Sequence, residues 1–255
     1  MVNVTTVTTR AALAGLDPAT NPTIFLREGG RSGIFAWQAG DASAQVSNDP
    51  LQGLYIARSS NPSGSAGAWV RKWDGINGIP EWWGAQTNNS GTNCLPALQA
   101  CVTFCPQTNL AKADYWIDDS WTISQSYRKI VGQGCNSYST GEGTRIILQD
   151  STKDVMVIGV TPSSISDPST YLRQIHVQDL QLQFSTPVTP PSAGNDYTGP
   201  AGLRTQYLYE CEFRNVSGWE CSIGFAIYGN VGSRYLDCIA FRSSAGLTPS
   251  NDIWR

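Results

Sequence analysis

Short runs of alternating hydrophobic and polar residues recur along most of the chain, which is the pattern of half-buried β-strands. In the first 75 residues these runs flank two turn-rich segments, 27–32 and 58–67. The predicted strands are Thr23–Leu26, Gly33–Trp37, Gly53–Ala57 and Ala68–Trp73. We also expect a short helix over Thr9–Leu16, capped by Thr8 or Thr9 and ending near Gly15. Together these elements predict a small β module.

One segment has helical rather than strand periodicity. Its apolar positions recur at helical spacing between Cys94 and Cys105, with Asn93 available as a cap. Pro96 is tolerated in a first turn, and Pro106 ends the pattern. Residues 76–93 before it are rich in Gly, Asn and Pro, so we expect them to join two parts of the chain.

From about residue 115 onward the chain returns to strands of three to five residues, with no helical pattern between them. The predicted strands are Tyr115–Ile117, Trp121–Ile123, Lys129–Val131, Arg145–Leu148, Val155–Ile158, Gln174–Val177 and Leu180–Phe184. An acidic residue precedes an apolar one at Asp179, Glu210 and Asp237, at intervals of roughly 30 residues. Such a loose repeat is typical of a β-solenoid, in which each coil buries its inner face against its neighbours. A β-sandwich remains the alternative, because sandwich strands and irregular solenoid coils look alike in a single sequence.

Composition narrows the class of protein. The 255 residues carry a net charge of −3, with 15% charged and 40% hydrophobic residues, which disfavours a charge-rich helical bundle. A mildly acidic chain without a dense basic patch is a poor nucleic-acid binder. The sequence holds no apolar run long enough for a membrane span, and its start does not resemble a signal peptide. Seven cysteines are an odd number, so at least one thiol stays free or pairs with another chain.

Two segments carry a resemblance to known families. One resemblance is to the start of pectate-lyase-like right-handed β-helices. It is carried by Trp83-Gly84-Ala85, by Ala97-Leu98-Gln99-Ala100 and by residues 129–134. The upstream part of the chain resembles the N-terminal β module of bacteriophage tailspike and tail-fibre proteins. The resemblance lies in the order of the segments 9–13, 40–43, 53–57 and 67–71. Residues 86–93 depart from the superfamily, because the acidic residues often found in that loop are missing.

The resemblance implies an all-β fold with one short capping helix. Residues 1–78 would form an N-terminal β module of the virion-attachment type, and residues 79–255 the capping helix and first coils of a single-stranded right-handed parallel β-helix. It also implies a homotrimer, contacts with other virion tail or neck proteins, and location in the virion after synthesis in the host cytoplasm. The chain would be either the first part of a longer spike or a short structural fibre.

Two functions follow from the resemblance. The first is a tail spike or fibre component that contacts host surface polysaccharide; the second is a polysaccharide depolymerase, a hydrolase or lyase. If the repeat register is right, the candidate catalytic residues Asp179, Glu210 and Asp237 stack on one side of the coils. The alternative is that these acids are solvated turn residues.

Aromatic residues offer flat faces to sugar rings. The candidate substrate-binding residues are Trp219, Tyr209, Tyr228 and Tyr235, and Trp116, Trp121 and Tyr207 share this pattern. Packing in the core or between subunits is the alternative for each of them. The common nucleotide, metalloprotease and serine-hydrolase motifs are absent, so we expect no cofactor and no metal site. His176, the single histidine, is expected on the surface of a strand.

Overall fold

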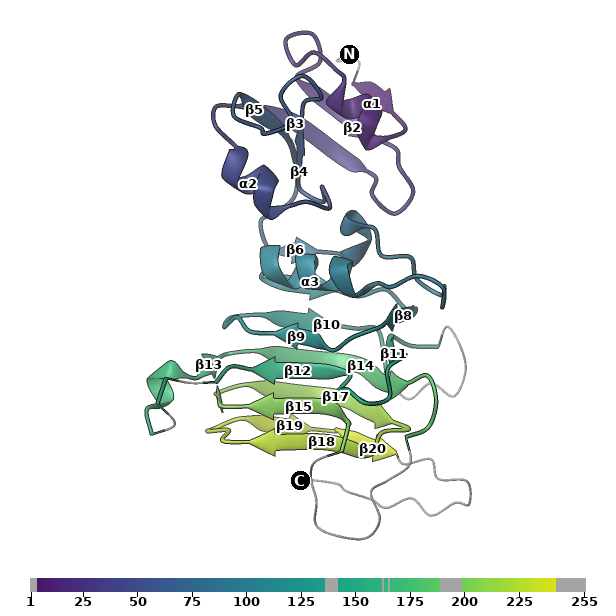
Figure 1. Ribbon diagram of the computed structural model, residues 1–255, viewed down its shortest axis with the longest axis vertical. Helices are drawn as coiled ribbons and strands as arrows, with labels where there is room; N and C mark the ends of the chain where they lie inside the picture. Colours follow the sequence, from purple (N-terminus) through teal and green to yellow (C-terminus); the bar gives the residue numbers. More distant parts are fainter. Residues whose placement is uncertain (1–3, 136–141, 162, 165, 189–198, 242–255) are drawn as a thin grey trace.

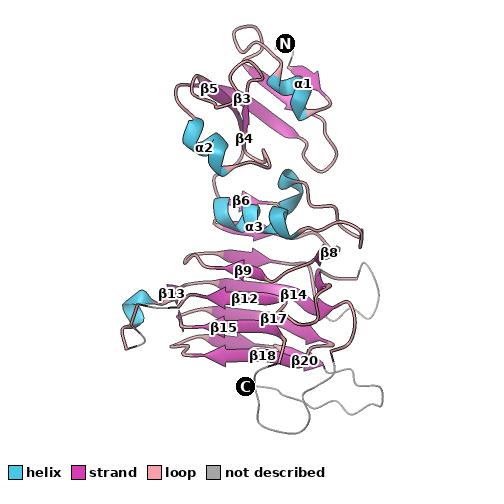
Figure 2. Ribbon diagram, in the orientation of Figure 1, coloured by secondary structure: helices cyan, strands magenta, loops and turns pink. Residues whose placement is uncertain are grey.

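The computed structural model describes residues 4–135, 142–161, 163–164, 166–188 and 199–241. It has two parts, which we call the N-terminal module (residues 4–75) and the coil stack (residues 77–241). Figure 1 shows the N-terminal module above the coil stack, with the strands of the stack lying one below another. Strands outnumber helices in both parts (Figure 2), so the predicted all-β class is confirmed.

The N-terminal module is a five-stranded sheet with two short helices against it. The strand order is β1 (Thr5–Val7), β2 (Thr23–Leu26), β3 (Gly33–Ala39), β5 (Gly67–Arg71) and β4 (Tyr55–Ala57). Helix α1 (Arg10–Ala14) begins where Thr9 Oγ1 accepts a hydrogen bond from the Ala12 amide at 3.1 Å, as its sequence predicts. A second helix, α2 (Ser43–Asn48), was not expected from the sequence. The core of this module is Leu13, Ile24, Leu26, Phe35, Ile56 and Trp69.

Helix α3 covers the upper end of the coil stack, after a short 3-10 turn, η1 (Pro80–Trp83). It spans Leu95–Phe104, which confirms the predicted helix, and the face with Leu98 and Cys101 is fully buried. The structure places Cys94 at the cap position, while Asn93 Oδ1 accepts from the Leu95 amide at 2.9 Å. The helix therefore closes the first coil with its apolar side.

Two arginines of the N-terminal module reach into this junction. Arg31 donates to the backbone oxygens of Trp82 at 3.0 Å and Trp83 at 2.8 Å. The guanidinium of Arg71 lies 4.6 Å from the ring centre of Phe35 and 4.7 Å from that of Trp82. Backbone hydrogen bonds and cation–π contacts thus join the two parts of the chain.

The coil stack is built from parallel strand pairs between successive coils. One sheet contains β6 (Asn77–Gly78), β7 (Gln107–Asn109), β8 (Asp114–Ile117), β10 (Lys129–Val131), β11 (Arg145–Leu148), β14 (His176–Phe184), β17 (Glu212–Trp219), β19 (Arg234–Leu236) and β20 (Ile239–Phe241). A second contains β9 (Trp121–Ile123), β12 (Met156–Gly159), β15 (Ala201–Gln206) and β18 (Ile223–Tyr228), and a third β13 (Leu172–Arg173) and β16 (Leu208–Tyr209). All pairs in these three sheets are parallel, which excludes the antiparallel sandwich for the described residues.

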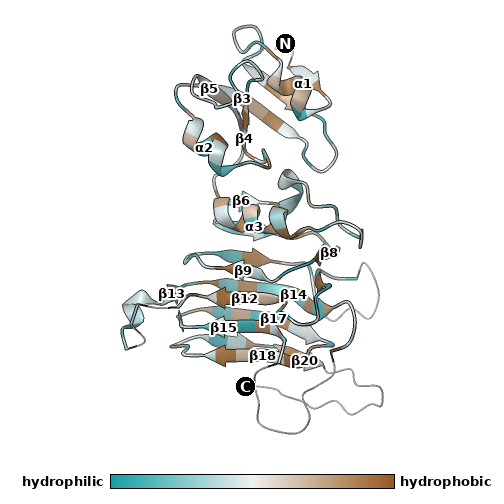
Figure 3. Ribbon diagram, viewed as in Figure 1, coloured by the Kyte–Doolittle hydropathy of each residue, from teal (hydrophilic) through white to brown (hydrophobic). Residues whose placement is uncertain are grey.

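The two strands expected at 174–177 and 180–184 are one bent strand, β14. Asp179 in its middle has a left-handed backbone with φ 58°, and Asn215 bends β17 in the same way with φ 50°. The bend turns the second half of each strand onto a different face of the coil. Side chains that alternate inward, such as Val177, Leu180 and Phe213, are fully buried, and hydrophobic residues recur along the strands in Figure 3.

Candidate functional site

The predicted carboxylates do not form one ladder. Leu180 pairs with Val216, and Arg214 pairs with Leu236, so the residues beside these pairs occupy one corner of three successive coils. That corner is made of Asp179, Asn215 and Asp237, with φ angles of 58°, 50° and 53°. The middle position is therefore an amide and not the expected glutamate.

Glu210 belongs to the preceding corner of its coil. The amide of Gln174 donates to Tyr209 O, and the amide of Glu212 donates to Ile175 O, which places Glu210 level with Gln174. Both residues have left-handed φ angles. The expected stacking of Glu210 with the two aspartates is wrong, because the acidic–apolar pattern occurs at two different corners.

The corner of Asp179 is held by hydrogen bonds. Asp179 Oδ1 accepts from Asn215 Nδ2 at 2.7 Å, and Oδ2 accepts from Gln178 Nε2 at 3.0 Å. The Cys135 thiol lies 2.7 Å from Asn215 Oδ1, and burial raises the pKa of this thiol. A protonated thiol is a weak nucleophile, so this corner does not have the chemistry of a cysteine hydrolase. Asp237 is exposed.

The aromatic candidates separate into three environments. Tyr235 points into the coil, where its ring stacks on Phe213 with centres 4.7 Å apart. Its hydroxyl lies 2.8 Å from Thr205 Oγ1 and accepts from Asn230 Nδ2 at 2.7 Å, and burial raises its pKa. This ring is part of the core, so it does not suit a sugar platform. Trp121 is also fully buried.

Tyr209 is partly exposed and Tyr228 is exposed, and Tyr209 directly precedes the corner of Glu210. The guanidinium of Arg173 sits 4.7 Å above the Tyr209 ring, and 45% of the surface of Tyr228 is exposed. His176 is exposed on β14, which confirms its predicted surface position.

Trp219 lies beside a hollow of about 330 Å³ on the face formed by β8, β11 and β14, which we call the groove. Its lining residues are Asn88, Ser90, Asp114, Trp116, Arg145, Ile147, Gln183 and Ser185. Trp219 is the register partner of Gln183, one coil further along. The sequence indicated Trp116 as a possible sugar platform, but none of the polar groups around it was singled out.

A buried ion pair forms the polar side of the groove. Arg145 Nε donates to Asp114 Oδ1 at 2.7 Å, and Arg145 Nη2 donates to Oδ2 at 2.6 Å. Their side chains are 12% and 4% exposed, so the guanidinium is held in a fixed orientation. The pairing arises because β8 and β11 are aligned with these two residues side by side.

Amide side chains continue the polar line toward Trp219. Gln181 Nε2 donates to Gln183 Oε1 at 3.0 Å, and Gln183 Nε2 donates to Glu220 Oε2 at 3.4 Å. The groove thus combines an indole face with guanidinium, carboxylate and amide groups. Among the described residues we find no cluster of three or more metal-ligating side chains, and none of their helices has the length and apolar character needed to cross a bilayer.

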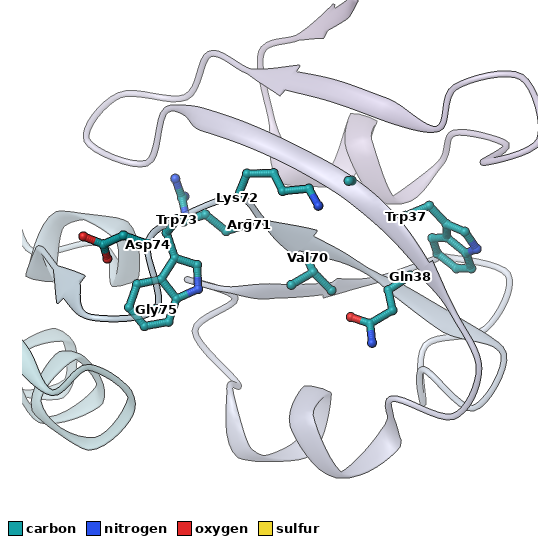
Figure 4. A pocket seen from close by; sticks show the side chains of 9 residues that line it. Trp37, Gln38, Val70, Arg71, Lys72, Trp73, Asp74 and Gly75 are labelled. Carbon is teal, nitrogen blue, oxygen red and sulfur yellow. The ribbon is translucent and has the colours of Figure 1, made fainter.

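A second hollow, of about 500 Å³, lies on the sheet of the N-terminal module (Figure 4). Gln38, Val70 and Lys72 line its length, and Trp73 and Asp74 lie at one end. Arg71, Lys72 and Asp74 are the charged residues of the lining, and the Arg71 guanidinium donates to the backbone oxygens of Gly53, Ser32 and Arg31. This arrangement offers a contact surface and no acid–base pair.

Comparison with known proteins shows a shared fold. No protein-family model and no curated protein matches the chain. The gp42 tailspike of Acinetobacter phage vb_AbaP_AS12 matches over 96% of this chain and 50% of its own length, with a TM-score of 0.58 and 14% identity. The enzymatically active domain of tailspike protein 2 of bacteriophage CBA120 matches over 94% of this chain and 36% of its own, with a TM-score of 0.50 and 15% identity. The chain therefore has a phage tailspike fold, as the sequence resemblance predicted, and spans half or less of these solved structures.

Proposed function

We propose that this chain is a component of a bacteriophage tail spike or fibre, located in the virion after synthesis in the host cytoplasm. Residues 1–78 attach it to other tail or neck proteins, and residues 79–255 form the capping helix and first coils of a right-handed β-helix that contacts host surface polysaccharide. The tailspike fold and the groove beside Trp116 support this proposal.

The main support for polysaccharide contact is the groove. A pyranose ring packs one apolar face on an indole, while its hydroxyls need donors and acceptors at its rim. Trp116 supplies the face, and Arg145, Asp114 and Gln183 supply the rim within the same hollow. The bidentate pair fixes the orientation of these groups before a ligand arrives, which lowers the entropy cost of binding.

The test is binding to a panel of purified bacterial capsular and O-antigen polysaccharides, measured by biolayer interferometry with the intact chain. We expect at least one polysaccharide to bind, and Trp116→Ala to weaken that binding by roughly tenfold, on the order of 1.4 kcal/mol. Lys112→Ala is the control, because Lys112 is exposed outside the groove lining. Binding to no polysaccharide, or equal binding by Trp116→Ala, would contradict the proposal.

A homotrimer is part of the same proposal. Tail spikes use three-fold symmetry to present three copies of one surface. Light scattering of the purified chain should give three times the chain mass of 27.6 kDa, with and without reductant. A stable monomer under both conditions contradicts the trimeric assembly for this chain.

The alternative is a polysaccharide depolymerase. The observation that favours it is the fold shared with a tailspike domain described as enzymatically active, together with exposed carboxylates at Glu210 and Asp237. Release of reducing ends, or of unsaturated uronic acid, from the bound polysaccharide tests it. Glu210→Gln and Asp237→Asn should then abolish release, because a glycosidase requires carboxyl groups as acid and base or nucleophile. Asp179→Asn is the third variant, and full activity in all three rules out these residues as catalysts.

A further inference from the structure

Tyrosines gather at one corner of the coil stack, where β13 is labelled in Figure 1. The amide of Tyr127 donates to Arg173 O at 2.9 Å, Arg173 pairs in register with Tyr209, and the amide of Tyr207 donates to Tyr228 O at 2.9 Å. These bonds bring residues from successive coils side by side. We call this group the tyrosine corner; its members are Tyr127, Tyr171, Tyr207, Tyr209 and Tyr228.

Backbone strain singles out two of its members. Tyr127 and Tyr207 have left-handed backbones, with φ angles of 60° and 54°. Bulky residues rarely adopt this conformation, whereas Asn and Asp tolerate it. At the Asp179 corner the residues with this backbone conformation are Asp179 and Asn215, and aspartate and asparagine adopt it more readily. The left-handed conformation of Tyr127 and Tyr207 therefore costs conformational free energy, and backbone strain of this kind is typical of functional positions.

Two of the five rings are open to solvent, Tyr207 and Tyr209 are partly exposed, and Tyr171 is buried. Tyr127 has 61% of its surface exposed and Tyr228 45%. The Tyr207 ring lies against Gly229, where an added Cβ would sit 2.6 Å from Tyr207 Cδ1. Tyr171 packs edge-on to Tyr207, with ring centres 5.4 Å apart. A glycine below and a ring at the side hold Tyr207 in place.

Charged groups stand between the rings. Arg173 is fixed over Tyr209 by its cation–π contact and donates from Nη2 to Pro168 O at 3.1 Å. The exposed carboxylate of Glu210 occupies the same corner column as Tyr127, with Gln174 between them. The surface therefore alternates aromatic faces with hydrogen-bonding groups, which fits a hydroxyl-rich ring better than an apolar protein partner.

We propose that the tyrosine corner is a second saccharide-binding site, separate from the groove, which receives sugar rings on Tyr127 and Tyr228 and their hydroxyls on Arg173 and Glu210. The proposal rests on the proposed polysaccharide contact, and it adds a second point of attachment for the same polymer. Two sites on one chain raise the avidity for a long polymer without changing the affinity for a short fragment.

The experiment compares a polysaccharide that binds the unaltered chain with a short oligosaccharide prepared from it. Tyr127→Asn relieves the left-handed strain, so we expect its melting temperature to stay equal or rise while polymer binding weakens by about fivefold. Tyr228→Ala, at an exposed position, should weaken polymer binding similarly. Both variants should bind fewer oligosaccharides per chain, because they keep the groove and lose the corner, whereas Trp116→Ala should lose the groove and keep the corner.

The outcomes separate this proposal from the one it rests on. Normal polymer binding by Tyr127→Asn and Tyr228→Ala overturns the tyrosine corner as a site and leaves the groove untouched. A lower melting temperature of Tyr127→Asn also overturns it, because the ring would then serve the fold. An unaltered chain that binds no polysaccharide contradicts the proposed function itself, and the corner with it.

Discussion

The indole Nε1 of Trp83 donates to Asp49 Oδ1 across 2.8 Å, and only 1% of each residue's surface is exposed. Asp49 belongs to the N-terminal module, and Trp83 to the turn that leads into the coil stack. The same carboxylate accepts from the backbone amides of Gly53, Leu54 and Tyr55 at 3.1, 2.7 and 2.9 Å. One buried carboxylate thus satisfies four donors and ties the two parts of the chain together.

Asp49→Asn should lower the free energy of unfolding by about 2 kcal/mol. The amide has one acceptor oxygen, and its NH₂ group would face backbone N–H donors, which leaves buried polar groups unpaired. Urea denaturation followed by tryptophan fluorescence measures the change. Asp41→Asn is the control, because Asp41 is exposed and an asparagine can still accept from the Ser43 amide. A loss below about 0.5 kcal/mol for Asp49→Asn would mean that the four bonds do not stabilise the junction.

Gly132→Ala should disrupt the contact between two coils. A Cβ at Gly132 would lie 2.1 Å from the backbone oxygen of Asp179, the residue at the bend of the next coil. Backbone atoms cannot rotate away as a side chain does, so we expect a loss of stability of about 2 kcal/mol or more. Thermal unfolding should show a clearly lower melting temperature than for Gly29→Ala, whose Cβ meets nothing within 4 Å. Equal melting temperatures would contradict the close approach of the coils.

Local pattern was enough to predict several elements. Trp121–Ile123, Lys129–Val131 and Arg145–Leu148 have the predicted bounds. The first two alternate between more and less buried side chains, and the third is a short apolar run with Ile146, Ile147 and Leu148 all buried. Helix α2 was missed because it has no buried residue and therefore no apolar periodicity. Strand β15 was also missed, since two of its buried positions are filled by Gly202 and the polar Thr205 and not by large apolar residues.

The site depends on the register between coils, which one sequence does not reveal. Asp179 and Glu210 look equivalent along the chain, but they occupy different corners because the loops between strands differ in length. The Asp114–Arg145 pair likewise follows from the alignment of β8 with β11, not from any local motif. The residue type of Trp219 suggested substrate binding, which stays a prediction, whereas its position beside Gln183 follows from the register of β14 with β17.

Alkaline pH should destabilise the chain through Tyr115. Its hydroxyl donates to Glu81 Oε1 at 2.7 Å, and burial together with the nearby Glu81 carboxylate raises its pKa above the usual value near 10. A group whose folded pKa is raised contributes stability that is complete below the unfolded pKa and is lost as the pH rises above it. We therefore expect stability to fall as the pH rises above about 10, because the unfolded chain ionises there while Tyr115 in the fold stays protonated.

The comparison that isolates this contribution is Tyr115→Phe. The variant lacks the ionisable hydroxyl, so its free energy of unfolding should fall less steeply between pH 9 and 12 than that of the unaltered chain. Tyr127→Phe is the matched control at an exposed tyrosine. Identical slopes for Tyr115→Phe and the unaltered chain would show that Tyr115 ionises normally in the fold.

Thiol reactivity tests whether the odd cysteine joins two chains. All seven cysteines are free in the structure, and five of them are buried: Cys94, Cys101, Cys105, Cys211 and Cys221. Cys135 and Cys238 are partly exposed. Even so, burial raises the pKa of Cys135, and it raises that of Cys238 to about 11. At pH 8 both are mainly protonated, so the native chain should react slowly with Ellman's reagent, at no more than these two positions.

In guanidinium chloride seven thiols should react at once, and Cys135→Ser and Cys238→Ser should each remove one of the slow native reactions. Fewer than seven reactive thiols in denaturant, recovered by reductant, would instead show a disulfide, and a reductant-sensitive dimer mass would place it between chains.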